Sequence, residues 1–132
     1  MNILIMAAGA VGGYFGSVLS TSNDVTFVAR GEHLRKIQEC GLSVKSVTSG
    51  NFVCWSKAYK EPPSEYRADL AIFCVKDYQN DEASEIMANS ISDNTTILTL
   101  QNGLGSGEFL SQKFGSEKVV LGAAYVEASK GE

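Results

Sequence analysis

The chain has 132 residues, which is enough for one domain with a buried core. Its composition, 44% hydrophobic and 20% charged, is typical of a globular protein and excludes an intrinsically disordered one. A net charge of −4 argues against a nucleic-acid partner, and no apolar stretch approaches the ~20 residues of a membrane-spanning helix. We therefore expect a cytoplasmic protein. With three cysteines lacking ligand spacing and one histidine, no metal site is expected.

Short apolar runs alternate with helical patterns along the chain. The runs cover residues 3–6, 25–29, 70–75, 97–100 and 119–124. Runs this short, apolar on both faces, are typical of strands buried in a parallel sheet. Helical patterns cover residues 10–20, 32–40, about 78–89 and 105–114, and Gly41 and Gly115 are expected to end two of these helices. The alternation predicts an α/β protein with a Rossmann-like, doubly wound and mainly parallel sheet.

Residues 42–60 depart from this alternation. Leu42 and Val44 alternate with polar residues, and Gly50-Asn51 is a turn signal before the apolar run at 52–55. This pattern predicts a small antiparallel hairpin attached to the sheet. Pro62-Pro63 then mark a loop before the next buried strand.

A glycine-rich turn follows the first predicted strand, with the sequence Ala7-Ala8-Gly9-Ala10-Val11-Gly12. In the dinucleotide fingerprint G-x-G-x-x-G, the second glycine lets the backbone approach the pyrophosphate, and the third lets helix and strand pack closely. Gly9 and Gly12 occupy these positions, and Ala7 replaces the first glycine. If that position needs a positive φ, the Ala7 Cβ costs on the order of 1 kcal/mol or more. The turn predicts a dinucleotide site, and the alternative is a domain that kept the turn and lost the ligand.

The second predicted strand ends in Arg30, where NAD-binding domains carry an acidic residue that bonds the ribose 2′-hydroxyl. A guanidinium suits a 2′-phosphate instead, because its planar fork makes paired, charge-assisted hydrogen bonds. Glu32 follows two residues later and is expected to point elsewhere. This position favours NADP over NAD, and the alternative is a solvated arginine. We expect His33 to be a surface residue of the following helix.

Five segments occur in one order along almost the whole chain: residues 8–16, 25–31, 74–79, 101–105 and 122–128. Together they resemble the ketopantoate reductase (2-dehydropantoate 2-reductase) family, from which Ala7 departs because the family normally has glycine there. The resemblance implies that Arg30 and Lys76 hold the 2′-phosphate end of NADP(H). It also implies that Asn102 lies near the nicotinamide and the substrate, and that the backbone around Ala128 closes over the cofactor.

The resemblance implies an oxidoreductase that transfers hydride from NADPH to a 2-oxoacid, with ketopantoate giving pantoate on the route to pantothenate. In that family a second, helical domain supplies the general-acid lysine and most substrate contacts. We therefore expect residues 1–132 to be the NADP-binding domain of a longer two-domain enzyme. We expect this domain to be inactive alone and to have no catalytic residue of its own. A homodimer is left open. The alternatives are a non-catalytic dinucleotide-sensing domain and the first domain of another hydroxyacid dehydrogenase.

Overall fold

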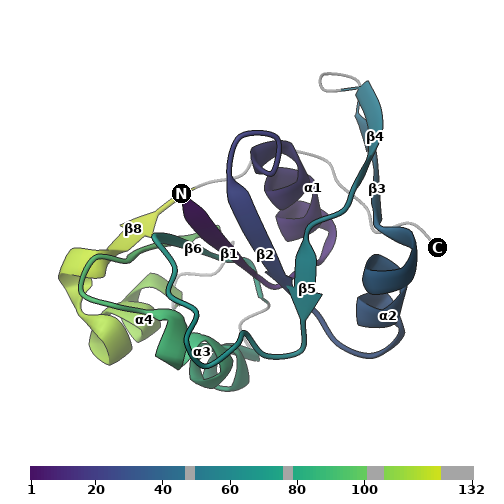
Figure 1. Cartoon of the computed structure of the whole chain (residues 1–132). Helices are drawn as coiled ribbons and strands as arrows, with labels where there is room; N and C mark the ends of the chain where they lie inside the picture. The colour runs from purple at the N-terminus through teal and green to yellow at the C-terminus, as the bar shows by residue number, and fades with distance from the viewer. Residues whose placement is uncertain (47–49, 76–78, 101–105, 123–132) are drawn as a thin grey trace.

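The structure, a computed structural model, describes residues 1–46, 50–75, 79–100 and 106–122, and its centre is a six-stranded sheet (Figure 1). The strand order is β5-β2-β1-β6-β7-β8, and every neighbouring pair is parallel. This arrangement confirms the Rossmann-like fold. The strands are β1 (Asn2–Met6), β2 (Asp24–Val28), β5 (Lys57–Tyr59), β6 (Leu70–Phe73), β7 (Thr96–Thr99) and β8 (Val119–Leu121).

The central strand β1 is apolar because both of its faces are covered. Along β1, Ile3 and Ile5 belong to one buried cluster, and Leu4 and Met6 to another. Alternate side chains of a strand point to opposite faces, so β1 contributes to the core on both sides. Burial of all four side chains explains why the short runs read as continuous hydrophobic sequence.

The helices lie where the sequence predicted them, to within a few residues at their ends. Gly41 (φ 75°) and Gly115 (φ 105°) follow the last residues of α2 and α4, as expected for glycines that end helices. No helix of the described residues is long and apolar enough to span a membrane. The helices are α1 (Ala10–Leu19), α2 (Gly31–Cys40), α3 (Asn80–Met87) and α4 (Ser106–Phe114), with 3-10 turns η2 (Ala88–Ser90) and η3 (Ser116–Lys118).

The segment 42–60 differs from the expectation in three respects. β3 (Leu42–Ser46) and β4 (Gly50–Cys54) do form an antiparallel pair, but they make a separate two-stranded sheet that extends beside α1 and α2 (Figure 1). Gly50 pairs with Ser46 inside this ladder, so the turn predicted at Gly50-Asn51 is wrong, and the connecting residues 47–49 lie outside the described part. The structure also contains β5, an edge strand of the main sheet that the sequence pattern did not predict.

The strand order places a reversal of direction next to β1. From β1 the chain moves to β2 and β5 on one side, and then returns to β6, β7 and β8 on the other side. In open α/β sheets, ligands bind outside the carboxyl ends of the strands at such a switch point. We therefore expect a ligand to bind near the residues that follow β1, β2 and β6.

Candidate dinucleotide-binding site

A cleft of about 220 Å³ lies at the carboxyl ends of β1 and β2. It lies at the switch point of the sheet, where the fold leads us to expect a ligand. The glycine-rich turn and Arg30, two features singled out in the sequence, both contribute to its wall. The lining residues come from both sides of the reversal: Met6, Ala7, Ala8, Gly9, Val28, Ala29, Arg30, His33, Lys60, Val75, Gln79, Glu82, Ala83 and Ile86.

The glycine-rich turn is anchored to the sheet and opens α1. The amide of Ala8 donates to the carbonyl oxygen of Val28 at 2.9 Å, which ties the turn to the end of β2. Gly9 is the N-cap of α1, and no side chain caps the helix there. The first amides of a helix lack intrahelical acceptors and carry partial positive charge. The turn therefore presents hydrogen-bond donors beside the cleft.

Gly12 packs against the turn so closely that no side chain fits. A Cβ at Gly12 would lie 2.2 Å from the carbonyl oxygen of Ala7 and 2.9 Å from Cγ2 of Ile5. The structure thus shows the close helix-to-strand packing expected of the third glycine. Gly9 is different, because a Cβ there would meet no atom within 4 Å. The space beside Gly9 is available to a ligand.

Ala7 does not carry the backbone strain that the sequence led us to consider. None of the described residues other than glycine has a positive φ, so the turn is built without a left-handed residue at position 7. The condition for that cost, a positive φ at position 7, is therefore not met. Ala7 is half-buried and packs against the core cluster that contains Leu4 and Phe73.

Arg30 stands at the edge of the cleft but is already paired. It is the N-cap residue of α2, two residues after the end of β2, and its Nη1 lies 3.1 Å from Oε1 of Glu82 in the first turn of α3. Both side chains are more than half exposed, at 62% and 61%. Glu32 points elsewhere, as expected, and pairs with Arg35. The role of Glu82 leaves no local signal in the sequence, because Glu82 lies 52 positions from Arg30.

His33 also differs from the expectation. Its Nε2 hydrogen-bonds the backbone carbonyl oxygen of Ala8, and the side chain is partly buried at the cleft. The expectation of a plain surface residue is therefore wrong: His33 connects α2 to the glycine-rich turn. A contact between residues 25 positions apart leaves no local sequence signal, so only the fold reveals it.

Three predicted site residues lie outside the described part of the chain: Lys76, Asn102 and Ala128. Their roles stay predictions. Val75 and Gln79, the described residues on either side of the segment that contains Lys76, both line the cleft. Before that segment, burial raises the pKa of the Cys74 thiol to about 12, which disfavours the reactive thiolate form at physiological pH.

Comparison with known proteins gives one family. The family profile described as ketopantoate reductase PanE/ApbA matches residues 3–132. A 2-dehydropantoate 2-reductase of Pyrococcus horikoshii is 36% identical over 109 residues, which cover 82% of this chain and 35% of that protein. The crystal structure of a 2-dehydropantoate 2-reductase from Geobacter metallireducens matches 100% of this chain and 44% of its own, with a TM-score of 0.91 and 34% identity.

A second enzyme activity occurs among the structural neighbours. A D-mandelate dehydrogenase, solved with NADH and anilino(oxo)acetate, is 27% identical with a TM-score of 0.86, over 93% of this chain and 40% of its own. The chain thus spans less than half the length of each of these three relatives. Since the family profile covers almost every residue, the chain belongs to the ketopantoate reductase family.

Proposed function

We propose that this chain is the NADP(H)-binding domain of an oxidoreductase that reduces a 2-oxoacid, with 2-dehydropantoate as the substrate. The observation that carries the proposal is the position of Arg30, which lies two residues after the end of β2 and lines the same cleft as Gly9. A guanidinium at this point of a Rossmann fold suits a 2′-phosphate, as an acidic residue suits a free ribose hydroxyl.

The described residues fit a dinucleotide laid across the switch point. We propose that the uncapped first turn of α1 donates hydrogen bonds to the pyrophosphate, with the backbone of residues 7–12 beside it. Arg30, with Lys76, would hold the 2′-phosphate. When bound, the nicotinamide supplies the hydride for the keto carbon. Asn102 would orient the nicotinamide ring and the substrate. The backbone near Ala128 would cover the cofactor. The general acid would come from the rest of the protein.

Replacement of Arg30 tests the cofactor assignment. Since a hydrogen bond to a charged group contributes about 1.5–3 kcal/mol, Arg30→Ala is expected to weaken NADPH binding at least tenfold and NADH binding much less. Titration calorimetry with both dinucleotides measures this. Arg35→Ala is the matched control, because Arg35 is similarly exposed and pairs with Glu32 outside the cleft. Equal binding of NADPH and NADH to the unchanged chain would contradict the proposal.

Replacement of Asn102 tests the proposed contact with nicotinamide and substrate. An amide can donate and accept at once, so Asn102→Ala in the full-length enzyme is expected to lower turnover at least tenfold. An Asn-Gly pair that only shapes a turn would instead lose about 1 kcal/mol of stability. Turnover, NADPH binding and melting temperature are compared with the unchanged enzyme. If only the melting temperature falls, Asn102 is a turn residue.

The second candidate is the reduction of a different 2-oxoacid. It is favoured by the likeness to a D-mandelate dehydrogenase, whose nucleotide-binding domain has the same fold. Both candidates use the described cleft in the same way, so they differ only in the residues that contact the substrate. Turnover of the full-length enzyme with NADPH and a panel of 2-oxoacids, including ketopantoate and benzoylformate, distinguishes them.

A further inference from the structure

The cleft contains a carboxylate that the proposed function does not use. Glu82 lines the cleft from the first turn of α3, on the side of the sheet reversal opposite to Arg30. Its Oε1 lies 3.1 Å from Nη1 of Arg30, although the two residues are 52 positions apart. The guanidinium proposed for the 2′-phosphate therefore already has an anionic partner.

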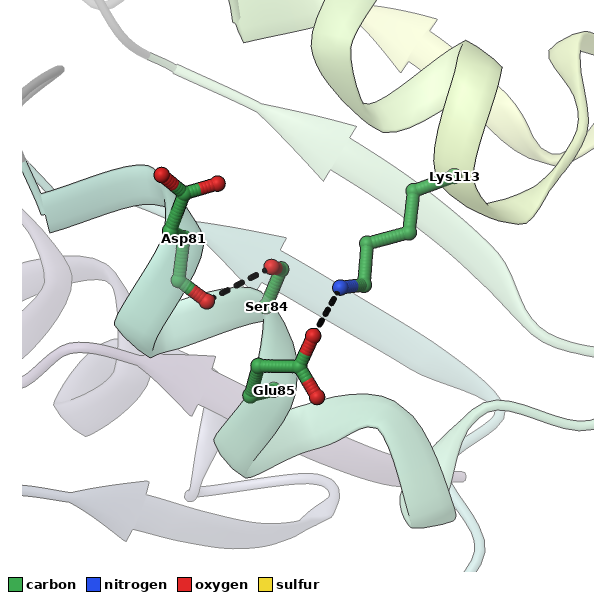
Figure 2. A network of polar contacts seen from close by, with 4 residues as sticks. All are labelled: Asp81, Ser84, Glu85 and Lys113. Carbon is green, nitrogen blue, oxygen red and sulfur yellow. Dashed lines mark hydrogen bonds and ion pairs between the residues drawn. The ribbon is translucent and has the colours of Figure 1, made fainter.

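Of the two glutamates of α3, Glu82 is the one that pairs with Arg30. One turn further along, Glu85 pairs instead with Lys113 of α4, while the hydroxyl of Ser84 donates to the backbone carbonyl of Asp81 at 2.9 Å (Figure 2). Among the described residues that line the cleft, Glu82 is the one with a carboxylate. Within the described lining of the cleft, the negative charge beside Arg30 thus comes from a single side chain.

A carboxylate in this place affects the two cofactors in opposite directions. A phosphate monoester carries a charge between about −1.5 and −2, so a 2′-phosphate on Arg30 would lie beside a like charge. NADH has a neutral hydroxyl at the same position, and a carboxylate accepts a hydrogen bond from it. Glu82 therefore weakens the binding of NADPH and not the binding of NADH.

We propose that Glu82 is a specificity-determining residue, which competes with the 2′-phosphate for Arg30 and so lowers the preference of the chain for NADPH over NADH. The inference rests on the proposed function, in which Arg30 binds the 2′-phosphate. Arg30 alone would give strict NADPH selectivity, and the Arg30–Glu82 pair gives a weaker one.

The test is the ratio of the dissociation constants for NADH and NADPH in Glu82→Gln. An exposed ion pair is worth up to about a fivefold change in an equilibrium constant, so we expect the ratio to rise about fivefold, mainly through tighter NADPH binding. Glu85→Gln is the matched control, since it makes the same charge change in the same helix. Its ratio is expected to change less than twofold. Melting temperatures show whether each variant is folded.

Repeating Glu82→Gln in the Arg30→Ala background shows whether the two residues act together. We expect the effect of Glu82→Gln on the ratio to disappear when Arg30 is absent. If it persists unchanged, Glu82 acts through its general field and the proposed competition is wrong. If Arg30→Ala lowers the ratio but Glu82→Gln leaves it unchanged, this inference fails and the proposed function stands. If Arg30→Ala itself leaves the ratio unchanged, the proposed function fails.

Discussion

Gly12→Ala is expected to lower the free energy of unfolding by about 3 kcal/mol, the upper part of the range for overpacked cores. The new Cβ would lie 2.2 Å from the carbonyl oxygen of Ala7 and 2.9 Å from Cγ2 of Ile5. The nearer atom belongs to the backbone and cannot rotate away, so α1 must separate from the end of β1. That movement would disturb the buried Ile5 side chain as well. Urea unfolding of the variant and the unchanged chain measures the difference.

Gly9→Ala is the matched control for stability. It adds the same methyl group three residues earlier, where no atom lies within 4 Å, and the φ of −80° at Gly9 is accessible to alanine. Its free energy of unfolding is expected to remain within about 0.5 kcal/mol of the unchanged chain. A Gly12→Ala chain as stable as the Gly9→Ala chain would show that α1 does not contact the turn in this way.

The same Gly9→Ala variant is expected to bind NADPH about thirtyfold more weakly. Gly9 lines the cleft and caps α1, where the proposed pyrophosphate would approach the backbone. A methyl group in that space displaces the phosphate from the helix amides, at a cost of about 2 kcal/mol. Fluorescence titration with NADPH measures the loss, which should be similar for NADH because both dinucleotides carry the pyrophosphate.

Gly13→Ala provides the comparison for binding. Gly13 lies in the same turn of α1 but does not line the cleft, and its Cβ would be 3.2 Å from the flexible Cδ2 of Leu42. We expect its affinity for NADPH to change less than threefold. Binding by Gly9→Ala as tight as by Gly13→Ala would mean that the pyrophosphate does not lie at this turn. The Gly12→Ala and Gly9→Ala variants thus separate two requirements. Folding requires glycine at position 12, and binding of the dinucleotide requires glycine at position 9.

The sequence by itself determined five strands of the central sheet, the glycine-rich turn and the position of Arg30. Each of these depends on residues close together in the chain. A strand covered on both faces favours apolar side chains along its whole length, and Ile3 to Met6 show this directly. The ends of α2 and α4 were also determined locally, because Gly41 and Gly115 adopt a positive φ that other residues avoid.

Only the tertiary structure decided the remaining features. β5 has three residues, of which Ala58 alone is buried, so its pattern is too short to signal a strand before it pairs with β2. The contacts of His33 with Ala8 and of Glu82 with Arg30 join residues 25 and 52 positions apart. Such contacts depend on the order of strands in the sheet, which brings the start of α3 opposite the end of β2. The anionic partner of Arg30 was therefore determined by topology, which no local pattern of residues encodes.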